Sequence, residues 1–391
     1  MNLALLGTDD DVLALAAAAL AGGHTITWLG DVRPQDAAPL AQLVPGVTPE
    51  ADWEALLGQG IAEAVVVGHG TADDALRAEQ LKRLVTDAVP LLVVHPAGSS
   101  VLTYYELDMG RREIHSVLRH YNPMIGSPSA VELAAWAQSG SGEIGTVHQI
   151  VCQRFANDCG RDALLPHLAR DAELLRSIAG EVRTASAVGP QPADASYASL
   201  QTQMTTAGSA TVRWSATPTG APSSHAELTL IGERGTKSIR LPAADWDAAR
   251  AAIDGLAEAV PAGGSARSEA ASTWHRATAA MEIVDAILLS LEKRRTIEVH
   301  PQRLTEQLAF RGTMSAFGCG LLVLAFLLLM VVGVMGGMET LLGHPLATFW
   351  PWGLFLLLAV FLLLQVVPWL VTKRPPPAAE EEPPAGGLGK D

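Results

Sequence analysis

The chain has 391 residues, 41 acidic and 27 basic side chains, and a formal net charge of −14. Nucleic acid is excluded as the main partner, because phosphate binding needs clustered positive charge. The three cysteines form no Cys-x-x-Cys pair, which argues against a metal site or a disulfide framework and favours a reducing compartment.

Short apolar strands alternate with helices over the first 120 residues. The predicted strands are residues 2–6, 25–29, 64–68 and 91–95, and the predicted helices are residues 10–21, 49–57, 72–86 and 101–111. Asp9 is placed to cap the first helix, and Gly22-Gly23 to end it. Continuous apolar strands separated by helices are typical of a parallel sheet covered on both faces. We therefore predict an α/β, Rossmann-like doubly wound domain over residues 1–122.

The pattern changes in the second half of the soluble region. The predicted strands are residues 146–153, 197–205, 208–216 and 226–240, the predicted helices are residues 128–138, 163–179 and 274–291, and residues 260–268 form a loop. The last strand range is a hairpin, since glycines interrupt it at Gly232 and Gly235. Residues 123–300 are therefore predicted to form an α+β domain with a mainly antiparallel sheet, for substrate binding or oligomerisation.

Two long segments near the C-terminus carry no charged side chain. Residues 312–338 and 346–371 are each long enough to cross a hydrocarbon core of about 30 Å as a helix. We predict a transmembrane hairpin, preceded by a linker at residues 301–311. Residues 372–391 form an acidic, proline-rich tail of low complexity, which predicts disorder.

Basic residues flank the hairpin but are absent from its loop. They are Lys293, Arg294, Arg295, Arg303 and Arg311 before it, and Lys373 and Arg374 after it. The positive-inside rule then places both ends in the cytoplasm. The N-terminus has no basic flank and is not expected to be a signal peptide. The prediction is a multi-pass membrane protein whose soluble region and tail are cytoplasmic, with the lipid bilayer as a partner.

Several segments follow one another in an order that suggests a family. They are Gly7 after the first strand, Asp31 after the second, His120-Tyr121-Asn122-Pro123, the segment at residues 139–147, and the helix end at residues 173–182. Together they resemble the glucose–fructose oxidoreductase / inositol dehydrogenase (Gfo/Idh/MocA) family over about residues 1–300. The resemblance implies a dinucleotide-binding domain, a substrate domain, and hydride transfer between a nicotinamide and a sugar-like metabolite.

The resemblance also implies a cofactor, NAD or NADP. The residues that would bind it are Gly7, Thr8, Asp9, Asp31, Gly68 and His69. Asp31 matches the acidic residue expected on a ribose 2′-hydroxyl, which favours NAD. Of the Gly-x-Gly-x-x-Gly pattern only Gly7 is present, and Asp9 adds bulk and negative charge where the second glycine lets the pyrophosphate approach. The alternative is that the aspartates here only cap and charge a helix.

The catalytic elements of that family are altered as well. Its Glu-Lys-Pro motif is replaced by Val94-His95-Pro96, and His95 is a candidate acid or base, or a structural histidine. The family's acid/base histidine falls on Arg170, and His167 is the nearest alternative. Tyr121 and Asn122, with Arg170, are the predicted substrate residues; the other interpretation of the pair is a turn fixed by the proline that follows.

Two functions remain open from the sequence. The first is a membrane-anchored oxidoreductase-like protein that resembles NAD(P)-dependent sugar or polyol dehydrogenases and has degenerate catalytic motifs. The alternative is a non-catalytic pseudoenzyme or scaffold that holds a nucleotide or a partner protein at the membrane. A homodimer would fit the resemblance.

Overall fold

A computed structural model describes residues 1–299, apart from residues 59, 140–142, 191–195, 209, 221–223, 242–245 and 263. The linker, the two predicted spans and the tail therefore lie outside the described residues. Within the described ranges, none of the helices combines the length and the apolar character needed to cross a bilayer.

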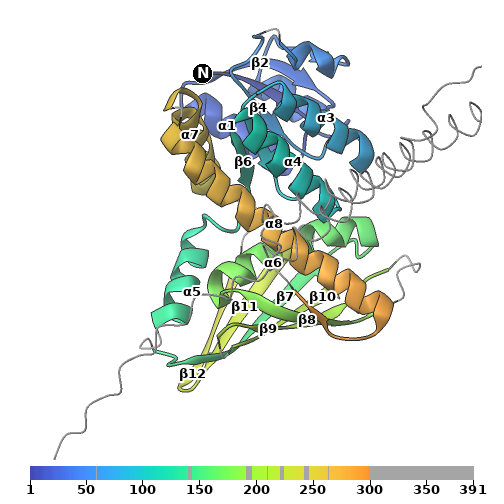
Figure 1. Cartoon of the computed structure of the whole chain (residues 1–391), viewed down its shortest axis with the longest axis vertical. Helices are drawn as coiled ribbons and strands as arrows, with labels where there is room; N and C mark the ends of the chain where they lie inside the picture. The colour runs from blue at the N-terminus through green and yellow to red at the C-terminus, as the bar shows by residue number, and fades with distance from the viewer. Residues whose placement is uncertain are drawn as a thin grey trace, which may run out of the picture. The chain divides into compact units, whose positions relative to one another are not determined.

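The first half of the chain forms a parallel sheet with helices on both faces (Figure 1). In spatial order its strands are β3 (Pro49–Glu50), β2 (Thr25–Gly30), β1 (Asn2–Leu6), β4 (Ala64–Val67), β5 (Leu91–Val94) and β6 (Leu118–Tyr121). Its helices are α1 (Asp10–Ala21), α2 (Ala37–Leu43), α3 (Asp74–Thr86) and α4 (Val101–Ile114). The predicted Rossmann-like arrangement is confirmed, because every neighbouring pair of strands in this sheet is parallel.

Strand β1 shows why this sheet is buried on both faces. Ala4 and Leu6 belong to the core cluster that contains side chains of α3 and α4, and Leu3 and Leu5 belong to the cluster that contains side chains of α1. Successive side chains of a strand point to opposite faces, so one apolar run supplies both layers. Burial of each leucine contributes about 1.5–3 kcal/mol to the stability of the folded state. This energy favours a central position for the strand, where both of its faces are covered.

The second sheet is mixed. In spatial order its strands are β12 (Gly235–Leu241), β11 (His225–Gly232), β7 (Val147–Ala156), β10 (Thr211–Pro218), β9 (Gln201–Thr206), β8 (Val182–Val188) and β13 (Ile297–Glu298). Only β10 and β7 run parallel among its described pairs. The predicted α+β character with a mainly antiparallel sheet is confirmed.

Three helices accompany this sheet, and the last of them links it to the first. They are α5 (Pro128–Ser139), α6 (Arg161–Ala179) and α8 (Gly264–Lys293). Helix α8 contacts β6 in the first sheet and β8 in the second, and it also packs against α6. Helix α7 (Trp246–Ala262) packs against α1. A segment from the second half of the chain therefore helps to cover the first sheet on the side of α1.

Some local predictions were wrong. The helix expected at residues 49–57 is strand β3 followed by a 3-10 helix, η1 (Trp53–Leu56), capped by Asp52 through the Glu54 amide. The loop expected at residues 260–268 is also wrong, because α7 runs to Ala262 and α8 begins at Gly264. Helices α2 and α7 and strands β6 and β8 were not predicted.

Candidate functional site

The candidate residues gather at the carboxyl edge of the first sheet. Gly7 follows β1, Asp31 follows β2, His69 follows β4, His95 follows β5 and Asn122 follows β6. Since the carboxyl ends of parallel strands meet at one edge, residues far apart in the sequence become neighbours there. Helix α6 of the second half faces this edge, which its Arg170 reaches through contacts with Asp11 and His95.

Gly7 has the conformation expected of a first glycine in a dinucleotide turn. Its φ is +79°, and its amide donates to Gly30 O at 2.9 Å. A Cβ at this position would lie 2.6 Å from Gly68 O and would also collide with the guanidinium of Arg77. The Arg77 side chain from α3 therefore packs directly against the first glycine of the turn.

Asp31, the predicted ribose ligand, is already bound by the chain itself. Its carboxylate pairs with the Arg77 guanidinium and accepts hydrogen bonds from the amides of Thr71 (2.9 Å) and Ala72 (3.3 Å). Burial alone would raise the pKa of Asp31, but the bonds from Thr71 and the charge of Arg77 lower it. Arg77 also donates to His69 O at 3.0 Å. Asp31 therefore fixes the loop between β4 and α3 instead of facing an open groove.

Asp9 stands at the N-terminus of α1, where a pyrophosphate would bind in this fold. Its carboxylate accepts from the Val12 amide at 2.8 Å and the His69 amide at 3.0 Å, and it lies 2.7 Å from His69 Nδ1. Burial opposes the charged form, but these contacts with His69 and Val12 hold the pKa of Asp9 well below its usual range. An ionised carboxylate thus occupies the positive end of the helix.

Thr8 is also engaged within the chain. Its hydroxyl donates to Asp36 Oδ2 at 2.8 Å and accepts from the Arg33 amide at 2.9 Å. Arg33 in turn pairs with Asp36 at 2.7 Å, so its guanidinium is committed as well.

These contacts decide whether a dinucleotide fits the residues present. Asp31, the residue expected on the ribose, is paired with Arg77, and the N-terminus of α1, where the pyrophosphate would bind, holds the Asp9 carboxylate. Both features that would bind a dinucleotide are used for internal contacts. The described conformation therefore does not fit NAD or NADP.

Arg170 stands where the family's acid/base histidine is expected. Its Nη2 lies 2.6 Å from Asp11 Oδ2, and its Nε donates to the backbone oxygen of His95 at 2.7 Å. Burial raises the pKa of Asp11, an effect that the Arg170 charge partly offsets. Arg170 thus ties α6 to both α1 and the end of β5. Its neighbour His167 has its pKa lowered to about 4 by burial and by the charge of Arg154.

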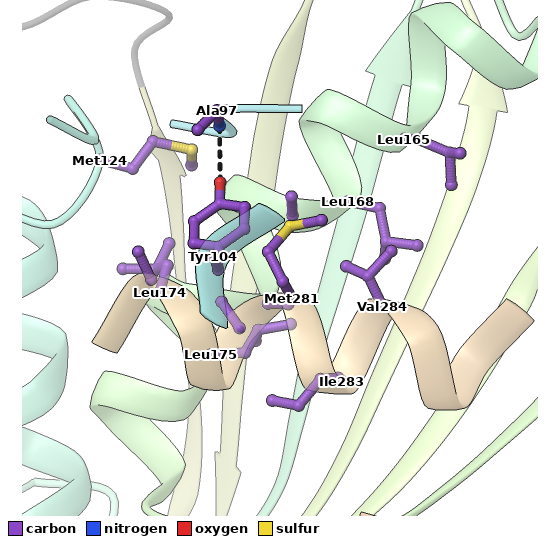
Figure 2. Packing of buried hydrophobic residues seen from close by; sticks show 14 of the residues in the cluster. Ala97, Tyr104, Met124, Leu165, Leu168, Leu174, Leu175, Met281, Ile283 and Val284 are labelled. Carbon is purple, nitrogen blue, oxygen red and sulfur yellow. Dashed lines mark hydrogen bonds between the residues drawn. The ribbon is translucent and has the colours of Figure 1, made fainter. Parts of the chain in front are cut away.

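His95 is enclosed by the protein. It is 1% exposed, and its Nδ1 lies 3.0 Å from the hydroxyl of Tyr104. That hydroxyl also accepts a hydrogen bond from the Ala97 amide at 2.6 Å, as Figure 2 shows, so Tyr104 links His95 to the loop after β5. Burial lowers the pKa of His95 to about 3, which keeps the ring neutral. In this position the His95 ring packs inside the protein, below the carboxyl edge of the sheet. A catalytic role for His95 or His167 stays a prediction.

A buried polar cluster joins β6 to α6. Glu173 accepts from Asn122 Nδ2 at 2.9 Å and lies 2.6 Å from His120 Nε2, and Asn122 also donates to Arg170 O at 3.2 Å. Tyr121 is 3% exposed. The structure therefore places the Asn122 side chain against the Arg170 backbone, and the role of Tyr121, Asn122 and Arg170 in substrate binding stays a prediction.

Sequence reasoning missed three residues of the candidate site. They are Glu173 and His120 in this cluster, and Arg77 beside Asp31. Glu173 lies three residues after Arg170 on α6. That spacing places the two side chains on one face of a helix, so it could have indicated that Glu173 lies in the site beside Arg170. His120 was noted only as part of the segment that carries the family resemblance. Arg77 had no sequence indication, since it reaches Asp31 from 46 residues away.

Two adjoining cavities lie beside this network. Their volumes are about 360 and 380 Å³, and both are lined by His69, Ala72, Asp74, Pro96, Gly98 and Asp162. Loops after β4 and β5 and the first turn of α6 therefore enclose a space of metabolite size.

Comparison with known proteins identifies the fold. No family model matches the chain, and neither does any curated protein. Among solved structures, it is similar to GenD2 from gentamicin A biosynthesis in complex with NAD (17% identity, TM-score 0.63, 77% of this chain and 96% of that one). It is also similar to a myo-inositol dehydrogenase from Corynebacterium glutamicum (15%, 0.60, 77% and 99%). A third is the WlbA dehydrogenase from Bordetella pertussis in complex with NADH and UDP-GlcNAcA (14%, 0.61, 76% and 98%). The chain shares the fold of these dehydrogenases over about three quarters of its length (76–77%), as the resemblance predicted.

Proposed function

We propose that the chain is a membrane-tethered, small-molecule-binding protein that has this dehydrogenase fold but does not transfer hydride. The observation that carries the proposal is the Arg77–Asp31 pair over Gly7. A dinucleotide could enter only after this part-buried ion pair is broken, which costs about 2–3 kcal/mol, less than the roughly 3–5 kcal/mol of a fully buried pair. Dinucleotide affinity is reduced by the same amount.

The residues at the catalytic positions support the proposal. Arg170 cannot act as a general acid or base near neutral pH, and it is held by Asp11. His95 is buried against Tyr104 and is not among the residues that line the cavities. The degenerate motifs thus coincide with side chains that now stabilise the contact between the two halves of the chain.

The tether rests on the sequence alone. Residues 312–338 and 346–371 carry no charge, and basic residues flank the pair on both sides. A hairpin of two membrane-spanning helices would hold the soluble region at the cytoplasmic surface of a bilayer. The protein would then present its binding site close to the membrane.

A second candidate is an NAD(H)-dependent oxidoreductase acting on a sugar-like metabolite. It is favoured by Gly7 and Asp31, which keep their places at the ends of β1 and β2. GenD2 and WlbA, which share the fold, were crystallised with NAD or NADH. For this candidate Arg77 must leave Asp31 before the cofactor binds.

Thermal denaturation of the full chain in detergent micelles separates the two candidates. The scans are run with and without millimolar NAD⁺, NADH, NADP⁺ or NADPH, with GenD2 in the same detergent as a positive control. A ligand at 100 times its Kd stabilises the folded state by about 2.7 kcal/mol. We expect no shift with any of the four. A shift in the wild type that disappears in Asp31→Ala would overturn the proposal and establish the second candidate.

A further inference from the structure

The cavity of about 360 Å³ has an apolar floor built from two helices. Leu165 and Ala169 of α6 and Met281 and Val284 of α8 line it, and all four side chains are buried. Figure 2 shows Leu165, Met281 and Val284 within the packed layer between these helices. This volume lies at the lower end of the range for small-molecule sites, roughly 300–1,000 Å³. The floor suits a compact apolar group.

The rim of the cavity carries acidic side chains. Asp73 and Asp74 lie at the start of α3 and Asp162 lies in the first turn of α6, and all three are exposed. Asp73 caps α3 through the Leu76 amide at 2.8 Å, and Asp74 accepts from the Ser99 amide at 3.0 Å. Each helix N-terminus offsets about half a charge, so three carboxylates at two helices leave the rim negative.

The cations of this region do not cancel this charge. Arg161, an exposed residue in the first turn of α6, offsets at most one of the three carboxylates, and two further cations are already paired. Arg77, which lines the adjoining cavity, is paired with Asp31. His69 lines both cavities, and its Nδ1 is held by the ionised carboxylate of Asp9. The field at the opening therefore repels phosphates and carboxylates and attracts a protonated amine.

We propose that this cavity binds a small organic cation, whose apolar body rests on the floor and whose amine faces the carboxylates of Asp73, Asp74 and Asp162. The inference rests on the proposed function, because it assigns a ligand class to the small-molecule site. A phosphate-bearing dinucleotide and this ligand have opposite charges, so the two are told apart by experiment.

Three probes with the same ring isolate the effect of charge. Cyclohexylamine is protonated at neutral pH, cyclohexanol is neutral and cyclohexanecarboxylate is negative. Isothermal titration of the full chain in uncharged detergent micelles measures each affinity, with titrations into empty micelles to correct for partition. We expect the amine to bind roughly tenfold more tightly than the alcohol, as a few partly screened ion pairs provide, and the carboxylate to bind most weakly.

Two variants and a control assign the binding to this cavity. Ala72→Phe places a ring in both cavities and should abolish amine binding. Asp162→Asn should reduce the preference for the amine about threefold and leave alcohol binding unchanged. Asp87→Asn removes an exposed charge at the far end of α3 and should change neither.

Several results would overturn the inference. They are no amine binding at millimolar concentration, alcohol or carboxylate binding as tight as that of the amine, and wild-type affinity in both Ala72→Phe and Asp162→Asn. A thermal shift of the wild type with NAD(H) would instead overturn the proposed function, and the amine titration would still decide the ligand class of the cavity.

Discussion

Glu173 provides a pH-dependent test of how α6 is held against the first sheet. It is 3% exposed, and its carboxylate meets His120 Nε2 at 2.6 Å and Asn122 Nδ2 at 2.9 Å. Burial alone would raise its pKa, but the charge of His120, its hydrogen bond and the bond from Asn122 lower the pKa from 4.5 to about 2. The folded state therefore binds the proton of this group less tightly than the unfolded state does.

The sign of the effect follows from that difference. A depressed folded-state pKa stabilises the protein above pH 4.5, and the contribution is lost as the pH falls towards 2. At about 1.4 kcal/mol per pH unit, the full contribution at pH 7 is about 3 kcal/mol. About 1 kcal/mol of it remains at pH 3 by the same linkage relation.

The perturbation is Glu173→Gln, which removes the charge and keeps the size. Urea denaturation of the full chain in uncharged micelles, followed by tryptophan fluorescence, gives the free energy of unfolding at each pH. We expect the variant to be about 3 kcal/mol less stable at pH 7, and the gap to narrow by about 2 kcal/mol at pH 3. Glu132→Gln, at an exposed position on α5, should stay within about 0.5 kcal/mol of the wild type. A gap below about 1 kcal/mol at pH 7, or one that does not narrow in acid, would refute the reasoning.

Three further predictions test the other contacts. Arg77→Met leaves Asp31 without its guanidinium, so urea denaturation should show a loss of about 2–3 kcal/mol, with a smaller loss in Arg77→Lys; an unchanged midpoint would contradict the pairing. Arg170→Met removes the pair with Asp11 and the bond to His95 O, so amide exchange in α6 should become faster; equal exchange in the two proteins would argue against this role. The positive-inside rule predicts that protease removes the C-terminal tail in inside-out vesicles only, and cleavage in right-side-out vesicles would reverse the topology.

The strands of the first sheet differ in how well the sequence predicts them. Strands β1, β4 and β5 are continuous apolar runs, because each is buried on both faces. Strand β6, at the edge of the sheet, was missed because Arg119 and His120 interrupt its apolar pattern. Helix α7 was not predicted, and its last turn, which contains Pro261, falls in the range that was predicted as a loop. Local patterns therefore predict central elements better than edge elements.

The candidate site was predictable in position but not in its contacts. The ends of β1, β2, β4 and β5 place Gly7, Asp31, His69 and His95 at one edge by topology alone. Which of them remain available to a ligand depends on side chains that arrive from helices. Arg77 and Glu173 reach their partners across 46 and 53 residues, and no spacing in the sequence encodes such pairs.

The aspartates at this edge show how stabilisation and dinucleotide binding compete for the same groups. A pyrophosphate and a carboxylate both favour the N-terminus of a helix, and Asp9 already fills that position at α1. A ribose hydroxyl and a guanidinium both bind an acidic side chain at the end of β2, and Arg77 already pairs with Asp31. Asp11 is likewise paired with Arg170 of α6. All three carboxylates are paired within the chain. A single substitution that brings back the family's glycine at position 9 or a catalytic residue at position 170 would therefore leave the other paired carboxylates unavailable to a ligand. A change of function at this edge would therefore need several substitutions together.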